Sequence, residues 1–422
     1  MADLRARFES FREARERARL DHAAGLADAF DPERIEAEYA DVTSGDALPA
    51  LRADAEAAHF AGERAARTRF VLAVAQAALA ASLRETDAHM EARRRAGAEP
   101  DELDELRSER IALRSTALAK LGFASARAFA EALRPGVDYA LWSAGAARAL
   151  AALEPALRDA GGASGAESSF AAELPAPRLR AALDYALEGL GLDLERVPDL
   201  DSDGEPRAGK APLAFAGAPR VPGDVRLVYA PAAGLAAHGA LFAAAGSALH
   251  AAFTSPALPL ERRALGDPAL PGGFGEALRA LLREARLGAA LAGVAEEHFA
   301  AVALRARLLE LRRTAERVAG ELALAELAPG AGAPQLGPAG FLASLGPALS
   351  SVDELRAASF GALFAGAQRA RFGREWWKAR GAGELLKELW NTGSSYGLEA
   401  LARELGLAPL GAEVLLEAEL SR

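Results

Sequence analysis

The sequence predicts a mainly α-helical protein, and three observations carry that prediction. Alanine, leucine, arginine and glutamate, which are strong helix formers, are abundant along the 422 residues. Apolar residues recur at spacings of three and four, as at Phe70, Val74 and Ala78, which is typical of helices with one buried face. Convincing β signals occur only between Asp201 and Pro231, so any sheet is expected to be small.

Residues 1–165 are expected to form an N-terminal helical lobe. Residues 1–20 carry charges throughout and favour an exposed amphipathic helix. A helix beginning near residue 101 is expected to end at Gly122, because glycine is common just after a helix C-terminus. A short helix over 124–133 follows, and the glycine- and serine-rich stretch 161–177 is typical of a linker.

Residues 175–422 are expected to form a second, larger domain. Its β element is a hairpin at about 212–230, where a Pro-Gly turn precedes a strand with alternating apolar residues. A helix over about 234–254 follows directly. Further helices are expected within the C-terminal part, 341–422, after a break rich in glycine and proline at Pro329–Gly340.

Charge and cysteine content exclude several function classes. The chain has 59 acidic and 49 basic residues, a net charge of −10, and no basic block, which argues against binding to nucleic acid. It contains no cysteine, so disulfides, thiolate metal sites and a cysteine nucleophile are excluded. Lys210 and Arg207 lie in a glycine-containing turn without the spacing of a phosphate-binding loop, so nucleotide binding is not indicated.

The sequence also favours a cytoplasmic protein without a membrane span. Residues 1–20 contain no apolar run and resemble neither a signal peptide nor an anchor. Residues 227–260 lack Asp, Glu, Lys and Arg, and their length would suffice to span a bilayer. They nevertheless contain Pro231, Pro256 and Pro259 and many alanines and glycines, which drive insertion weakly. A buried core helix is therefore expected there.

Residues 207–274 contain three phrases in a distinctive order. These are VPGDVRL at 221–227, LFAAAGSALH at 241–250 and LGDPALPGGF at 265–274. In this order they resemble the thimet oligopeptidase and oligoendopeptidase F family of zinc peptidases, where a hairpin along a cleft leads into a helix reading LF-H-E-x-G-H-A-L-H. The matching positions are Leu241, Phe242, Gly246, Ala248, Leu249 and His250. The resemblance implies a zincin-like fold of helical lobes around a cleft, with a small hairpin beside the former zinc helix.

The residues that carry the family's chemistry are missing from these phrases. In such a motif two histidines four residues apart bind one zinc, a glutamate after the first activates water, and a glutamate on the next helix completes the ligands. The resemblance assigns these four roles in turn to Ala243, Ala244, Ser247 and Gly272. None is a metal ligand or a base, apart from a serine hydroxyl that is a poor zinc donor. The tyrosine or histidine expected to stabilise an oxyanion is also missing from 347–356. No catalytic residue, metal or other cofactor is therefore expected.

His250 and Glu276 are the remaining candidates for a replacement metal site. His250 lies seven residues after Ala243 and therefore on the same helix face, and Glu276 lies one turn beyond Gly272. His238 is twelve residues before His250, about 18 Å along a helix, which is too far to share one zinc. A buried, hydrogen-bonded histidine is the simpler interpretation of His250.

The predicted function is that of a non-catalytic metallopeptidase homologue, which binds a peptide or a protein partner in the former active-site cleft. The joint replacement at Ala243, Ala244, Ser247 and Gly272 motivates this prediction. Two alternatives stay open: an active metallopeptidase or other hydrolase with a rearranged metal site, and a structural partner of an active paralogue. The sequence does not specify an oligomeric state.

Overall fold

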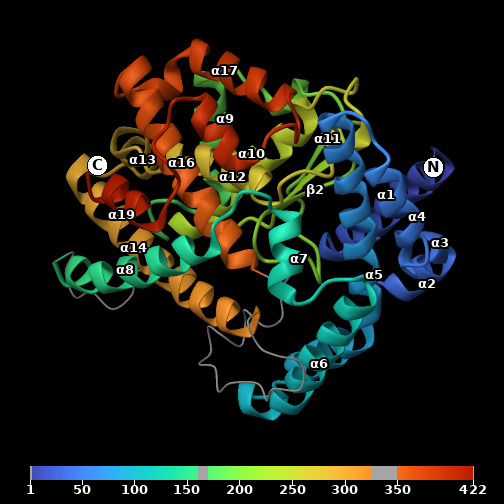
Figure 1. Ribbon diagram of the computed structural model, residues 1–422. Helices are drawn as coiled ribbons and strands as arrows, with labels where there is room; N and C mark the ends of the chain where they lie inside the picture. The colour runs from blue at the N-terminus through green and yellow to red at the C-terminus, as the bar shows by residue number, and fades with distance from the viewer. Residues whose placement is uncertain (1, 160–169, 326–348, 422) are drawn as a thin grey trace. The chain divides into compact units, whose positions relative to one another are not determined.

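A computed structural model describes residues 2–159, 170–325 and 349–421 (Figure 1). The chain divides into two compact units, each made of segments that are not contiguous in sequence. Unit 1 comprises Met1–Ala14, Asp31–Ala147 and Arg313–Val352, and unit 2 comprises Arg15–Phe30, Arg148–Arg312 and Asp353–Arg422. These boundaries differ from the continuous division expected near residues 165–175. Composition marks loops, whereas the units are defined by contacts between segments far apart in the chain.

Unit 1 is helical throughout its described part. The helices that lie wholly within it are α2 (Pro32–Glu38), α3 (Ala40–Thr43), α4 (Leu48–Glu56), α5 (Ala61–Arg95), η1 (Pro100–Leu103), α6 (Asp104–Lys120) and α7 (Ala126–Leu133). The helix that was expected to end at Gly122 corresponds to α6, and the short helix expected over 124–133 corresponds to α7.

Unit 2 combines helices with a three-stranded sheet. Its helices are η3 (Ala176–Arg178), α9 (Leu179–Gly189), η4 (Leu194–Arg196), α10 (Leu235–Phe253), α11 (Leu260–Arg263), α12 (Ala269–Leu282), α13 (Ala285–Ala292), η5 (Trp376–Lys378), α17 (Arg380–Asn391), α18 (Leu398–Glu404) and α19 (Ala412–Leu420). Its strands are β1 (Leu200–Asp203), β2 (Phe215–Arg220) and β3 (Asp224–Val228).

Among the described residues, four helices continue from one unit into the other along the chain. They are α1 (Ala2–Ala23), α8 (Tyr139–Asp159), α14 (Glu296–Ala325) and α16 (Ser350–Phe372). The linker expected at 161–177 lies partly, and the break expected at Pro329–Gly340 wholly, outside the described residues, as do the first residues of the C-terminal stretch 341–422.

The first part of α1 is less exposed than its charge pattern suggested. Phe8 and Phe11 are buried in unit 1, where Phe8 meets Phe70 edge to face at 5.4 Å and Phe11 meets Tyr39 at 5.9 Å between ring centroids. The helix is amphipathic as expected, but its apolar face packs into a core. Two aromatic rings among many charges are sufficient to bury one face, because aromatic side chains remove a large apolar area from water.

The sheet has the strand order β1-β3-β2. Strand β2 runs antiparallel to β3, with Phe215 opposite Val228 and an irregularity between Gly217 and Arg220, so the predicted hairpin is confirmed. Strand β1 runs parallel to β3, with Leu200 opposite Val225, and was not predicted as a strand. Its residues are polar and lie at a sheet edge, where the apolar alternation that marks a strand is weak.

Polar contacts hold the turn after β1 in place. The Lys210 Nζ donates to Asp203 Oδ1 and to the Asp203 and Glu205 carbonyls at 2.8–2.9 Å. Burial opposes ionisation of Asp203, but hydrogen bonds from Arg207 and Lys210 outweigh it and lower the pKa of Asp203. The predicted turn around Lys210 is therefore built on a buried ammonium group, whose side chain is 1% exposed.

Helix α10 is a core helix of unit 2 and begins after Gly234, whose φ is +91°. It packs against α12, α9, α17 and the sheet. By length and composition alone it could span a membrane, as could the pair α13 and α14, which is bent by 105°. In unit 2, α10 is therefore packed as a core helix, as the sequence predicted.

Candidate functional site

Helices α10 and α12 approach each other closely because glycines face the contact (Figure 1). A Cβ atom on Gly246 would lie 2.4 Å from the Phe274 carbonyl oxygen, and one on Gly275 would lie 2.7 Å from the Ala243 carbonyl oxygen. Any larger residue would clash with backbone there. The turn of α10 that carries the predicted motif is thus in direct backbone contact with α12.

The structure brings the predicted site positions together. Ser247 Oγ donates a hydrogen bond of 2.9 Å to the Pro271 carbonyl, which belongs to the peptide bond with Gly272. Ala243 lies one turn before Ser247 on the same face of α10. Ala243 and Ser247 are partly accessible and Gly272 is exposed. The other residues of α10 between Ala243 and His250 are buried. We call these three positions, 243, 247 and 272, the junction face.

The residues of the junction face do not fit a catalytic zinc ion. Zinc requires imidazole, thiolate or carboxylate ligands, and this face offers a methyl group, a hydroxyl group and a glycine. Ala244, in the position of the general base, is a buried alanine with 7% exposure. Across residues 2–159, 170–325 and 349–421, no three His, Asp or Glu side chains are grouped so that they could hold a metal.

His250 lies in the core rather than on the junction face. It is 4% exposed, its Nε2 lies 3.3 Å from the Gly393 carbonyl, and its ring packs against Phe274 at 4.9 Å between centroids. Burial lowers the pKa of His250 to about 4. It is therefore a neutral imidazole that joins the end of α10 to the turn after α17.

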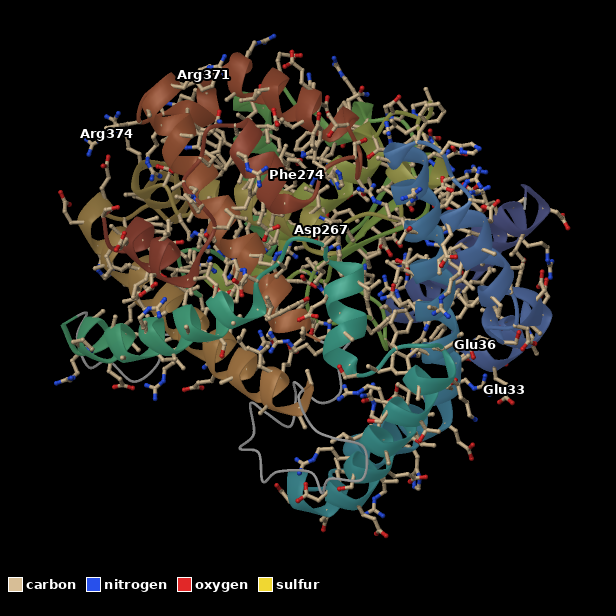
Figure 2. The ribbon with its side chains drawn as sticks, viewed as in Figure 1. Glu33, Glu36, Asp267, Phe274, Arg371 and Arg374 are labelled. Atoms are coloured by element: carbon tan, nitrogen blue, oxygen red, sulfur yellow. The ribbon has the colours of Figure 1, made fainter. Side chains whose placement is uncertain are left out.

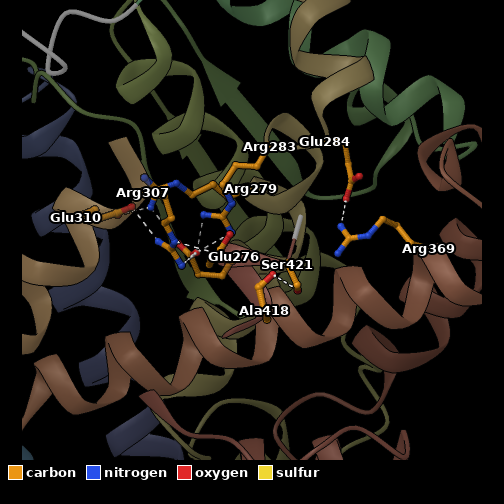
Figure 3. A network of polar contacts seen from close by, with 10 residues as sticks. Glu276, Arg279, Arg283, Glu284, Arg307, Glu310, Arg369, Ala418 and Ser421 are labelled. Atoms are coloured by element: carbon orange, nitrogen blue, oxygen red, sulfur yellow. Dashed lines mark hydrogen bonds and ion pairs between the residues drawn. The ribbon is translucent and has the colours of Figure 1, made fainter. Parts of the chain in front are cut away.

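Glu276 is held by arginine side chains (Figure 3). Its carboxylate accepts from Arg279 at 3.0 Å, from Arg307 at 3.1 Å and from Arg283 at 3.4 Å. Burial would raise its pKa, but the three guanidinium groups outweigh burial and hold the pKa far below its usual range. No hydrogen bond or ion pair joins Glu276 to His250 in the described chain.

The network around Glu276 extends to two more carboxylates. Arg307 also donates to Glu310 at 2.8 Å and to Glu419 at 3.2 Å, and Arg279 donates to Glu310 at 2.5 Å. Three glutamates therefore neutralise three arginines inside unit 2. The sequence signal for this cluster was weak, since acidic and basic residues three or seven positions apart are also typical of an exposed helix face.

A second buried network fixes the start of α12. Arg356 of α16 is completely buried and donates to Asp267 at 2.5 Å, to Asp353 at 2.8 Å and to Glu399 at 2.6 Å. Asp267, labelled with Phe274 in Figure 2, also accepts from the Leu398 N–H at 2.9 Å. The carboxylate in the phrase LGDPALPGGF thus has a structural role: it anchors the segment that presents Gly272.

Comparisons with known proteins identify the fold. No protein-family model and no curated protein matches the sequence. Among solved structures, an M32 carboxypeptidase from Deinococcus radiodurans R1 matches 97% of this chain over 95% of its own, with 16% identity and a TM-score of 0.63. A Pyrococcus furiosus carboxypeptidase matches 100% and 98%, with 11% identity and a TM-score of 0.71. Trypanosoma cruzi metallocarboxypeptidase 1 matches 99% and 97%, with 14% identity and a TM-score of 0.66.

These matches confirm the predicted mainly α fold with a small sheet, which is similar to the folds of helical metallocarboxypeptidases. The resemblance to oligoendopeptidase F itself is not confirmed, because the structural neighbours are carboxypeptidases. The phrases in α10 and α12 match a short zinc-helix pattern. A pattern of this length does not distinguish one peptidase family from another.

Proposed function

We propose that this protein is a non-catalytic homologue of zinc metallocarboxypeptidases and that it binds a peptide at the junction face. The fold likeness extends over nearly the whole chain. The residues at positions 243, 244, 247 and 272 supply neither a zinc ligand nor a general base. A scaffold of this kind can retain a peptide-binding surface without the chemistry.

One observation carries the proposal. Ser247 and the peptide group that precedes Gly272 are in hydrogen-bond contact, and α10 and α12 touch through glycine at this turn. This contact supports the assignment of positions 247 and 272 to one site, where neither residue is a metal ligand.

The contacts of His250 and Glu276 support the non-catalytic form over a rearranged metal site. His250 contacts the Gly393 carbonyl and Phe274 in the core. Glu276 is surrounded by guanidinium groups, which would repel a divalent cation. Both side chains are already engaged in contacts that a metal would have to break.

The accessible residues of α10 support a peptide as the ligand. Ala236, Ala240, Ala243 and Ser247 follow one another at spacings of four, three and four, and each is at least partly accessible. A face of methyl and hydroxyl groups allows a chain to approach the helix closely. This accessible face of α10 therefore carries small, uncharged side chains.

Zinc uptake and peptide cleavage test the loss of catalysis. We expect the wild-type protein, equilibrated with zinc and washed, to retain no stoichiometric metal by elemental analysis and to release no residue from a peptide library. His250→Ala should behave in the same way. One zinc per chain that is lost in His250→Ala would overturn the proposal in favour of a rearranged site.

Peptide binding is tested by blocking the junction face. Gly272→Trp places a large ring on the exposed position, so the peptides that wild-type protein retains from the library should bind at least about tenfold more weakly. The control is Gly62→Trp in unit 1, where no atom lies within 4 Å of a built Cβ. Equal binding by both variants, or no peptide retained by the wild type, would refute the peptide-binding role.

A further inference from the structure

Helix α6 in unit 1 buries arginine where a core face normally carries apolar residues. Arg107, Arg110 and Arg114 are 3%, 5% and 7% exposed and lie on one face of the helix, followed by the buried residues Ala117 and Leu118. Arginine is rarely buried to this extent unless a partner neutralises it. Each of these three guanidinium groups is therefore expected to have an acceptor or a counter-ion.

Two of the three arginines have carboxylate partners. Arg107 pairs with Asp104 at 3.0 Å, one turn earlier on α6. Arg110 pairs with Asp87, which lies on α5 and is partly exposed. The first pair lies within α6 and the second joins α6 to α5, so both arginines have a partner in unit 1.

Arg114 has no such partner. In the described part of the chain no hydrogen bond and no ion pair reaches its guanidinium group, and its Nε is buried without an acceptor. A guanidinium group carries five N–H donors, and a buried donor without an acceptor is costly. At 7% exposure, the Arg114 guanidinium group can therefore take an acceptor that is not among the described residues.

The carboxylates nearest to Arg114 are already engaged. Asp87 accepts from Arg110, and Glu321 accepts from Ser350 Oγ at 3.0 Å and from the Ser351 N–H at 2.9 Å. Burial and the neighbouring Arg110 lower the pKa of Arg114 to about 10, so the group still carries its charge at neutral pH. An anion entering this site would meet the guanidinium groups of Arg110 and Arg114, with the carboxylates of Asp87 and Glu321 also nearby.

We propose that Arg114 binds a small oxyanion, with Arg110 adding a second positive charge beside it. The guanidinium fork fits two oxygens of one phosphate or carboxylate group, which it can bind through two parallel hydrogen bonds. The ligand class is therefore a phosphate or a carboxylate, carried either by a free ion or by the end of a larger molecule. This site lies in unit 1 and does not depend on the proposed function of the junction face.

Calorimetric titration of the full chain with inorganic phosphate, and in parallel with acetate, tests this site. We expect the wild type to bind at least one of the two anions at millimolar concentration and to melt at a higher temperature in its presence. Arg114→Met should abolish both effects. Arg114→Lys, which keeps the charge but loses the fork, should weaken binding at least about tenfold.

Lys120→Met is the matched control, because Lys120 is an exposed cation on the same helix. It should bind the anion as the wild type does. Binding of phosphate alone assigns a phosphate ligand, and binding of acetate alone assigns a carboxylate ligand. The proposal is overturned if the wild type binds neither anion, or if Arg114→Met, shown to be folded by circular dichroism, binds as well as the wild type.

Discussion

The buried side chain of His250 makes the stability of the fold depend on pH. Its folded-state pKa, about 4, lies below the unfolded value of 6.5, because burial disfavours the charged ring. As pH falls below 6.5 the unfolded chain takes up the proton first, so stability is lost progressively between pH 6.5 and 4. The full effect corresponds to about 3 kcal/mol.

Denaturant unfolding at pH 7 and at pH 4.5 measures this effect. We expect His250→Gln, which keeps a donor near Gly393 but does not titrate, to lose less stability over this interval than the wild type. The exposed residue His59 provides the control, and His59→Gln should follow the wild type. An unchanged pH dependence in His250→Gln would show that His250 is not the group responsible.

Glu276 gives a second prediction at the scale of single residues. Glu276→Gln removes the charge that three arginines share, and breaking a buried ion pair by removing one partner costs about 3–5 kcal/mol. Thermal and denaturant unfolding should both report a large loss. Glu413→Gln removes one partner of an exposed pair with Arg148 and should change stability little. Equal effects of the two substitutions would contradict the network shown in Figure 3.

At the scale of elements, the contact between α10 and α12 depends on glycine. Gly246→Ala would place Cβ 2.4 Å from a backbone oxygen of α12, so the helices must separate. Overpacking of this kind typically costs about 1–3 kcal/mol, which denaturant unfolding can measure.

Gly366→Ala on α16 is the matched control for this contact. Its built Cβ meets only the far end of Arg369 at 3.9 Å, and alanine is favoured over glycine within a helix by about 1 kcal/mol. We therefore expect this variant to be slightly more stable than the wild type. A Gly246→Ala protein as stable as Gly366→Ala would show that the close approach is not required.

The elements that sequence could predict are those defined by local pattern. The hairpin and α10 follow from alternating and continuous apolar residues within a few positions of each other. Strand β1 was missed because pairing with β3, rather than its own polar residues, makes it a strand. The contact of Ser247 with the Pro271 carbonyl joins two different helices, α10 and α12, so local pattern alone does not determine it.

The charged networks could not be predicted for a physical reason. Glu276, Arg279 and Arg283 have the spacing of a solvated helix face. Their internal position follows from partners on other helices, as in the pair of Glu276 with Arg307. The buried guanidinium groups of Arg114 and Arg356 are likewise invisible in sequence. A charged residue reveals its burial only through partners far away in the chain.

At the scale of the whole molecule, a carboxypeptidase-like fold is combined with positions that lack metal ligands. The fold likeness at 16% identity or less extends from one end of the chain to the other. Such likeness shows the architecture, and the proposed loss of catalysis rests on the residues at 243, 244, 247 and 272. The claim is that the backbone still has the geometry of a metal site.

Restoring the ligands tests that claim most directly. The combined variant Ala243→His, Ala244→Glu, Ser247→His and Gly272→Glu should bind one zinc per chain, measured by calorimetry and elemental analysis. A Cβ at position 272 lies 3.3 Å from Ala357 Cβ, so the glutamate requires only a small shift of α16. The control carries the histidines about two turns earlier on α10, as Ala236→His, Ala240→His and Gly272→Glu, and should bind zinc far more weakly. If the combined variant folds but binds zinc no better than this control, the account is wrong.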